Sequence, residues 1–395
     1  MWEREGRKKS IDKFLLQEIL DRVLPEINSA TVDIRFAGGE PTLAGADWLT
    51  RAFELCREIG DKWGKDISFS MQTNGTQITP DLAALLAKNK VTVGISLDGP
   101  PHINELTRGN TEATLRGFAH LANAFGYSPG VIVTVSKTNV THLPMVIDYL
   151  RSLEVHYFRA NLMGASRKDA SQLVPTSIEW ALARLDLLST ISKHEGRIIE
   201  HNTSVMTKSL VSSALISNDI AMLGGCGGCN DIRCPAGSSL LYFDQSGNAY
   251  PCPRSNTSVN GSFAHIHDDL FFKHWEHEIT RLDKAMKDFN DECLNCPAQL
   301  VCDYGCHAFN ISQDNFFLTN CKASKIAYAK LSDYLESVAT VFYLTLWRDS
   351  IRGNQSGPNS IEAGFRPDSK LVADLTCKLK ASPRLEVPYL FNIDV

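Results

Sequence analysis

The stretch VDIRFAGGEP, residues 32–41, is a short run of strand-forming residues that ends in two glycines, a glutamate and a proline. Its β-branched and aromatic residues predict a strand at 32–36. Two glycines at the end of a strand let backbone N–H and C=O groups approach a ligand, because no Cβ atom stands in the way. The carboxylate of Glu40 beside such open groups suits a ligand with an ammonium group. A turn of this kind is also common as plain structure, so the rest of the chain has to decide.

Strand-like and helix-like segments alternate through the first half of the chain. Further strands are predicted at 67–72, 91–97, 131–135 and 157–162. Helices are predicted at 48–63, 80–88, 111–125 and 141–153, after a first helix with Ser10 as its N-cap. This alternation predicts an α/β fold with a parallel sheet, whose functional groups gather at the carboxyl ends of the strands. Residues 177–224 are predicted to be helices that lead away from the sheet, and a helix is predicted at 322–348.

Polar, glycine-marked segments follow two more of the predicted strands. One strand ends in SMQTNGT, residues 70–76, and the next ends in GISLDGPPHINELTR, residues 94–108. Ser96 and Asp98 are two residues apart and are therefore predicted to face the same side of a strand, where they could bind a ribose. Asn74 precedes a glycine and is either a ligand-facing residue or a turn residue.

Nine of the eleven cysteines lie between residues 226 and 321, and CLNCPAQLVCDYGC, residues 293–306, holds four of them. Dense cysteine spacing in a chain without a secretory signal indicates metal binding more often than disulfides. Zinc bound by four thiolates is one possibility. The segment FDQSGNAYPC, residues 243–252, predicts a hairpin with Gly247 at its tip. Cys56 and Cys377 stand apart and are predicted to be small buried hydrophobic residues.

Composition excludes several classes of protein. The formal net charge of −5 provides no basic surface of the kind that nucleic acids select. No apolar run approaches the ~18 residues of a membrane span, and the N-terminus lacks the pattern of a secretory signal. We therefore expect a cytoplasmic protein that binds neither nucleic acid nor membrane.

The order GGEP, QTNGT and SLDGP, with His102 and Arg108 shortly after, resembles the radical S-adenosylmethionine (SAM) enzymes. The cysteine-rich stretch resembles the SPASM extension of their peptide-modifying members, and the resemblance covers roughly residues 31–325. It implies a partial (β/α)6 barrel, a form of TIM-like barrel, that binds SAM. The residues that it assigns to SAM are Gly38, Gly39, Glu40, Pro41, Asn74, Ser96, Asp98, Asn161 and Leu162.

The same resemblance implies two auxiliary 4Fe-4S clusters. One would be bound by Cys293, Cys296, Cys302 and Cys321. The other would be bound by Cys234, Cys252, Cys306 and one of Cys226 or Cys229, a choice that the sequence leaves open. Thiolates are the usual ligands of such clusters.

One element of the family pattern is missing from these residues. Radical SAM chemistry needs a cluster bound by C-x3-C-x2-C after the first barrel strand, and no cysteine precedes Cys56. The strand that carries GGEP is the second in the family, so we expect the barrel to lack its first strand. Either an N-terminal extension supplies that strand and a third 4Fe-4S cluster, or the chain is a degenerate homologue that acts as a scaffold.

The resemblance favours a peptide maturase that forms a crosslink or a related oxidation in a ribosomally made peptide. Its expected partners are a precursor peptide or protein substrate and a small electron-donor protein. An inactive peptide-binding scaffold and an anaerobic sulfatase maturase are the alternatives, although Pro253 follows Cys252 where the sulfatase enzymes are expected to place an acidic residue. The predicted division is a radical SAM core at 1–176, a helical connector at 177–225, an iron–sulfur module at 226–325, and a C-terminal helix and tail at 326–395.

Overall fold

The computed structural model describes residues 11–164, 172–194, 196–214, 236–253, 255, 261–287, 296, 298, 302, 315–353 and 367–382. The chain divides into two compact units that interleave along the sequence. The first unit comprises Met1–Ser96, Asn110–Pro129 and Pro235–Asp288, and the second comprises Leu97–Gly109, Gly130–Cys234 and Phe289–Val395. The six strands of the parallel α/β sheet are divided equally between the two units.

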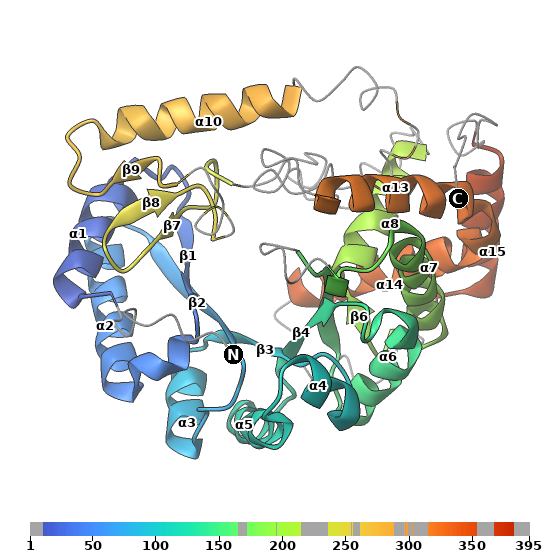
Figure 1. Cartoon of the computed structure of the whole chain (residues 1–395), viewed down its shortest axis with the longest axis horizontal. Coiled ribbons are helices and arrows are strands. Elements are labelled where there is room, and N and C mark those ends of the chain that lie inside the picture. The colour runs from blue at the N-terminus through green and yellow to red at the C-terminus, as the bar shows by residue number, and fades with distance from the viewer. Residues whose placement is uncertain are drawn as a thin grey trace. The chain divides into compact units, whose positions relative to one another are not determined.

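The sheet of the first unit consists of three parallel strands in the order β1, β2, β3, shown in blue to teal in Figure 1. Their bounds are β1 (Thr31–Phe36), β2 (Asp66–Thr73) and β3 (Thr92–Ser96). The helices of this part are α1 (Lys13–Val23), α2 (Ala46–Lys62), α3 (Pro80–Lys88) and α5 (Thr111–Phe125), with short 3-10 turns η1 (Leu24–Glu26) and η2 (Pro41–Ala44). The predicted strands and helices of this unit are confirmed, but α1 has Asp12 as its N-cap, where Ser10 was predicted.

An aromatic cluster fastens α2 to one face of this sheet. The rings of Phe36 and Phe53 lie 5.4 Å apart, and those of Phe53 and Phe69 lie 4.7 Å apart. Cys56 of α2 is fully buried beside them, as predicted, and burial raises the pKa of its thiol to about 12. The same helix therefore carries a thiol that stays protonated at neutral pH.

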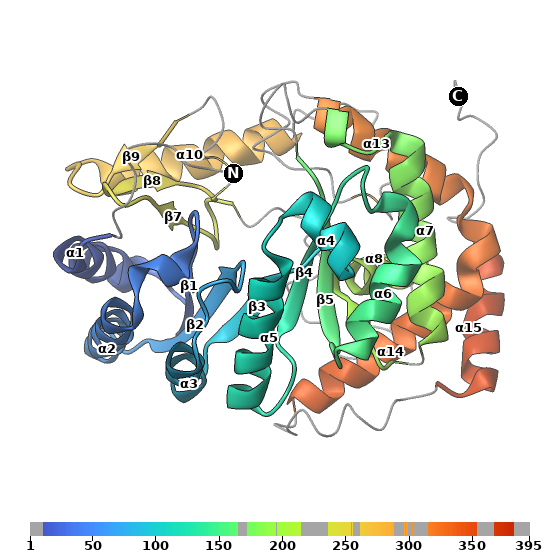
Figure 2. The same cartoon turned by 60° about the horizontal axis from the view of Figure 1, so that its bottom comes forward.

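A three-stranded antiparallel sheet and α10 (Phe271–Lys287) form the remainder of the first unit. The strands, in the order β7, β8, β9, are β7 (Tyr242–Phe243), β8 (Asn248–Tyr250) and β9 (Ala264–His265). The hairpin predicted at 243–252 is confirmed, and Gly247 at its tip has φ +86°. The first helix lies beside this sheet in both Figure 1 and Figure 2, and its Ile19 and Val23 share a buried cluster with Ala249 of β8 and Ala264 of β9.

The second unit holds three parallel strands in the order β4, β5, β6. Their bounds are β4 (Gly130–Val135), β5 (Tyr157–Leu162) and β6 (Ile199–Glu200). The helices are α4 (Pro101–Thr107), α6 (Leu143–Ser152), α7 (Ser177–Lys193), α8 (His201–Ala214), α13 (Asn315–Ala329), α14 (Leu335–Gly353) and α15 (Ser369–Lys380), with 3-10 turns η3 (Val140–His142) and η7 (Leu331–Tyr334). Two predicted strands, 131–135 and 157–162, are confirmed here. None of the helices in the described ranges is long and apolar enough to cross a membrane.

The prediction that residues 177–224 lead away from the sheet is only partly right. The segment returns at β6, which pairs with β5 and matches Phe158 with Glu200. Glu200 is 1% exposed, and its carboxylate accepts hydrogen bonds from the backbone N–H of Ala160 (2.8 Å) and of Thr203 (2.6 Å). Burial raises the pKa of Glu200, although these bonds oppose the rise. A strand of two residues is too short for an alternating pattern to reveal it.

Two predictions for the C-terminal part are wrong. The single helix predicted at 322–348 is two helices, α13 and α14, separated by η7. The break was not visible in the sequence, because the 3-10 turn buries Leu331 and so keeps the apolar spacing of a helix. Cys377 lies on α15 (Ser369–Lys380), where it is exposed although a buried residue was predicted. The buried residues of that helix are Val372, Leu375 and Leu379.

Candidate active site

The Gly38–Gly39 turn follows β1 directly, at the carboxyl end of the strand. Gly38 has φ +137°, a conformation that other residues rarely adopt. Among the residues that the structure describes, no atom lies within 4 Å of the place where a Cβ of Gly38 or Gly39 would stand. Pro41 then begins η2, and Glu40 is its N-cap. The structure therefore leaves space beside the backbone of this turn, and the binding of a ligand there stays a prediction.

The carboxylate of Glu40 ties the turn to the neighbouring strand. Its Oε1 accepts hydrogen bonds from the N–H of Thr42 (3.1 Å), the hydroxyl of Thr42 (2.6 Å) and the hydroxyl of Thr73 at the end of β2 (2.7 Å). Its Oε2 accepts one from the N–H of Asn74 (2.7 Å). These bonds use most of the acceptor capacity of the carboxylate within the protein itself. The structure thus gives the Glu40 side chain a positioning role, which leaves the backbone as the part of the turn that a ligand can reach.

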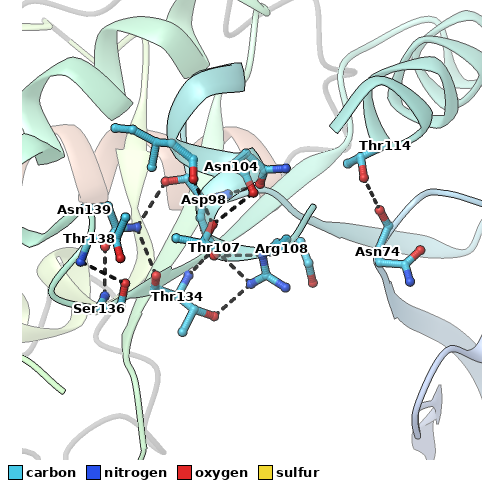
Figure 3. A network of polar contacts seen from close by, with 12 residues as sticks. Asn74, Asp98, Asn104, Thr107, Arg108, Thr114, Thr134, Ser136, Thr138 and Asn139 are labelled. Carbon is cyan, nitrogen blue, oxygen red and sulfur yellow. Dashed lines mark hydrogen bonds and ion pairs between the residues drawn. The ribbon is translucent and has the colours of Figure 1, made fainter. Parts of the chain in front are cut away.

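Asn74 acts as a turn residue, one of the two roles that its sequence context allowed. Its side-chain oxygen accepts hydrogen bonds from the N–H and hydroxyl of Thr76, at 2.9 and 2.8 Å. Thr114 of α5 donates to the carbonyl of Asn74 at 2.9 Å, as Figure 3 shows. Gly117, also on α5, packs so closely that a Cβ there would lie 2.0 Å from the carbonyl oxygen of Gly75. These contacts of α5 therefore fix the backbone of the turn at Asn74 and Gly75.

Ser96 ends β3 and is 5% exposed. The side-chain amide of Gln72 donates to its hydroxyl at 3.3 Å. The hydroxyl is thus held at the carboxyl end of the sheet in the first unit, where it keeps a proton to donate.

In the second unit, Asp98 is the centre of a buried polar network (Figure 3). Its carboxylate pairs with Arg108 through Nε and Nη2, both at 2.9 Å, and accepts the N–H of Thr134 at 2.7 Å. A charge pair of this bidentate form, with Asp98 3% exposed, fixes the segment after β3 to the end of β4. The carboxylate is engaged within the chain, and its assignment to a ribose stays a prediction.

Two asparagines that the sequence did not single out complete this network. The side-chain oxygen of Asn104 accepts the N–H of Asp98 at 2.9 Å. The side-chain amide of Asn139 donates to the carbonyls of Asp98 (3.1 Å) and Thr134 (3.0 Å). Both asparagines are fully buried. Asn104 lies within the quoted stretch 94–108, but no local pattern marks either residue, because their partners are set by the fold. His102, in contrast, is exposed on α4.

Asn161 and Leu162 end β5 in the second unit, opposite Thr134 and Val135 of β4. Asn161 is half-buried and Leu162 is 7% exposed. They therefore lie at the carboxyl end of the strand, where the resemblance placed them. Their assignment to adenine stays a prediction.

Four of the nine predicted cluster ligands fall within the described residues. Cys252 is buried, with its Sγ 3.2 Å from the hydroxyl of Ser255, and Cys296, Cys302 and Cys321 are half-buried in the second unit. In the parts of the chain that the structure describes, no three His, Cys, Asp or Glu side chains lie close enough to hold a metal ion. The predicted ligands Cys226, Cys229, Cys234, Cys293 and Cys306 lie outside the described residues.

The residues present do not fit the SAM-binding cluster of the radical SAM pattern. The first cysteine of the sequence, Cys56, is buried and has a pKa raised to about 12, so its thiol is unsuited to bind iron. No C-x3-C-x2-C occurs in the 395 residues. The glycine turn after β1, in contrast, fits SAM, because it offers open backbone groups.

Comparison with known proteins shows which family and which relatives this chain resembles. Residues 3–173 match the Radical SAM superfamily. A cysteine-type anaerobic sulfatase-maturating enzyme of Clostridium perfringens is 32% identical over 150 residues, which cover 37% of this chain and 40% of that protein. The mycofactocin maturase MftC of Mycolicibacterium smegmatis is 25% identical over 297 residues, which cover 70% of this chain and 66% of the relative.

Solved structures share the fold. Native anSMEcpe with bound AdoMet has a TM-score of 0.66 and 20% identity, covering 85% of this chain and 92% of that one. SuiB of Streptococcus suis, bound to its precursor peptide SuiA, has a TM-score of 0.54 and 16% identity, covering 80% of this chain and 69% of that one. At these identities the likeness concerns the fold, and it confirms the predicted α/β architecture.

Proposed function

Because residues 3–173 match the Radical SAM superfamily, we propose that this chain is a member of it and a SAM-dependent maturase that modifies a peptide or protein substrate. The observation that carries this proposal is the Gly38–Gly39 turn, whose backbone is open and whose position Glu40 fixes. SAM, when bound and reduced, supplies radical chemistry that no amino-acid side chain provides. The chain's own residues bind and orient it.

We assign the SAM-binding roles as follows. The backbone of Gly38 and Gly39 contacts the methionine end, and Glu40 and Pro41 hold the turn in place. Ser96 donates to the ribose, since its hydroxyl is held at the end of β3. The remaining proposed contacts are Asn74, Asp98, Asn161 and Leu162. We also propose that the six strands belong to a partial (β/α)6 barrel without its first strand, together with an iron–sulfur module.

The proposed substrate is a ribosomally made peptide in which a crosslink or related oxidation is formed. Supporting this, SuiB is described bound to a precursor peptide and MftC is a maturase. The sulfatase maturase remains the second candidate, favoured by the 32% identity with the Clostridium enzyme. Mass spectrometry separates the two. A precursor peptide from the same gene cluster changes mass under the first proposal, and only a sulfatase peptide changes mass under the second.

We propose two auxiliary 4Fe-4S clusters, bound by the two cysteine sets given above, in a chain that works in the reducing cytoplasm with a small electron-donor protein. Thiolates suit iron–sulfur clusters and zinc alike, so metal analysis decides between them. Anaerobically prepared protein should contain about eight irons per chain, and Cys302→Ala should contain about half as many. Stoichiometric zinc in place of iron would contradict this assignment.

Catalysis is tested by joining the chain to the expected N-terminal extension, which would bind the third 4Fe-4S cluster, incubating it anaerobically with SAM and dithionite, and measuring 5′-deoxyadenosine; the 395-residue chain alone should form none. Formation of 5′-deoxyadenosine in the presence of peptide supports the enzyme. The contrasting candidate is a peptide-binding scaffold, which is favoured by the lack of C-x3-C-x2-C in these residues. Peptide binding without any 5′-deoxyadenosine from the extended chain would support the scaffold.

A further inference from the structure

One face of β5 in the second unit carries a row of polar side chains. Because side chains alternate along a strand, Tyr157, Arg159 and Asn161 project to the same side. Phe158 and Ala160, on the other side, are each 1% exposed, whereas the three polar residues are half-buried. Strands of a parallel sheet are usually apolar on both faces, so this polar row is unusual for a packed core.

Arg159 lies in the middle of this row, and among the described residues it has no counter-ion. Its neighbour in register on β4 is Ile132, which offers no charge. In the described part of the chain no carboxylate lies within ion-pair distance of its guanidinium. Glu200 is matched with Phe158, so it belongs to the opposite face, and its oxygens are occupied by Ala160 and Thr203. A half-buried guanidinium without a partner is a site that favours an anion.

A second arginine meets the same face at the start of the strand. Arg348, on α14, lies with its Cζ 5.8 Å from the ring centroid of Tyr157. It is 9% exposed, and its Nη1 is a buried donor without a hydrogen-bond partner in the ranges that the structure describes. Its other nitrogens bond to Asp349, whose carboxylate is shared with Lys208 of α8. The carboxylate of Asp349 is thus shared by Arg348 and Lys208.

The other charged and titratable groups here do not supply the missing anion. The hydroxyl of Tyr157 pairs with Nδ1 of His201 at 2.5 Å. Toward the end of β4, Arg108 bonds to the Thr134 hydroxyl but is neutralised by Asp98. The row and its surroundings therefore carry four basic side chains, Arg108, Arg159, Lys208 and Arg348, against two carboxylates, Asp98 and Asp349. The imbalance is positive and centres on Arg159 of β5 and Arg348 of α14.

We propose that this face of β5 binds a carboxylate of the substrate, received by Arg159 with Arg348 beside Tyr157. The inference rests on the proposed function for the identity of the ligand as a peptide. Guanidinium groups bind carboxylates strongly through paired N–H donors, and a buried donor without a partner gains most from such an acceptor. Arg159 lies within the strand, two residues before Asn161, so its ligand is distinct from the SAM expected at the carboxyl ends of the strands. The substrate is thus a peptide that is recognised here by a side-chain or C-terminal carboxylate.

Titration calorimetry with three short peptides tests this proposal. The peptides are acetyl-Gly-Glu-Gly-amide, with a side-chain carboxylate, acetyl-Gly-Gln-Gly with a free C-terminus, and acetyl-Gly-Gln-Gly-amide, with neither. At least one carboxylate peptide should bind about tenfold or more tightly than the neutral peptide, and the tighter of the two identifies the source of the carboxylate. Equal binding of all three peptides by the wild-type chain overturns the proposal.

Variants locate the binding to this face. Arg159→Gln should abolish the preference for the carboxylate, and Arg159→Lys, which keeps the charge, should retain part of it. Arg116→Gln is the matched control, because Arg116 forms an exposed pair with Glu112 on α5. An Arg159→Gln variant that still prefers the carboxylate peptide would overturn the proposal. Competitive displacement of the peptide by SAM would also overturn it, because the carboxylate would then bind at the SAM site. These readouts need no SAM cleavage, so the carboxylate site can stand where the proposed catalysis fails.

Discussion

Glu40 provides the sharpest test of how the glycine turn is held. Its Oε1 accepts three hydrogen bonds, from Thr42 N–H, Thr42 hydroxyl and Thr73 hydroxyl, and its Oε2 accepts one from the Asn74 N–H. Thr42 and Thr73 are 4% and 1% exposed, so water cannot readily replace the carboxylate. Hydrogen bonds to a charged group contribute about 1.5–3 kcal/mol each, but bonds to one carboxylate are not additive. We expect Glu40→Ala to lower the free energy of unfolding by roughly 2–4 kcal/mol.

Glu40→Gln separates the roles of the two carboxylate oxygens, because it replaces one of them by an amide nitrogen. The amide oxygen can take the place of Oε1 and keep its three donors, and the amide nitrogen then faces the Asn74 N–H, donor against donor. The expected loss is about 1–2 kcal/mol. Amide hydrogen exchange should show faster exchange at Asn74 in both variants, and at Thr42 only in Glu40→Ala.

The control is Glu58→Gln, an exposed residue of α2. Slow exchange at Asn74 in both Glu40 variants would refute the clamp. So would a Glu40→Ala variant as stable as the Glu58→Gln control, because the two buried threonine hydroxyls would then have no need of the carboxylate.

Three further predictions concern Asn139, Gly117 and Asp244. Asn139→Ala should lower the free energy of unfolding by about 2–3 kcal/mol, because buried carbonyls of Asp98 and Thr134 lose their donor; chemical denaturation measures this, and a change under half a kcal/mol would contradict it. Gly117→Ala should destabilise by about 1–3 kcal/mol in chemical denaturation, since its Cβ would meet the Gly75 carbonyl oxygen at 2.0 Å. Gly126→Ala, at the C-cap of the same helix, tests backbone conformation alone, because no described atom lies within 4 Å of its Cβ position. Burial raises the pKa of Asp244, but hydrogen bonds from Asn248, Ser246 and Tyr250 outweigh it and hold the pKa in the folded state below the ordinary 3.8. The ionised Asp244 therefore stabilises the fold fully above pH 3.8. This contribution is lost as the pH falls through the pKa of the folded state. The difference in melting temperature between wild type and Asp244→Asn should shrink below that pH, and a difference that grows there would show the sign to be wrong.

Local signals were sufficient for the elements that position the candidate site. The predicted bounds 80–88, 111–125 and 157–162 coincide with α3, α5 and β5. In α3 the reason is visible, because Thr79 caps the helix and Pro80 occupies its first position. The glycine turn at Gly38 was likewise predicted from local sequence, because its φ of +137° is a conformation that favours glycine.

Long-range contacts account for what the sequence did not reveal. Asn139 bonds to the carbonyl of Asp98, 41 residues away, and such a role leaves no trace in spacing or composition. Glu40 was assigned to a ligand because its donors, the Thr73 hydroxyl and the Asn74 N–H, become its neighbours only when β1 and β2 pair. β6 and α15 were missed because two residues and an irregular tail provide too little pattern.

The central claim, that SAM binds at the glycine turn, is tested most directly by saturation-transfer NMR of SAM with the wild-type chain and with Gly39→Val. No described atom lies within 4 Å of the Cβ position of Gly39, so the variant should fold normally while its side chain fills the space that a ligand would use. The account predicts saturation of the methionine protons of SAM by the wild-type protein and its loss in Gly39→Val, with an unchanged melting temperature. Equal saturation in both proteins, or none in the wild type, would contradict it.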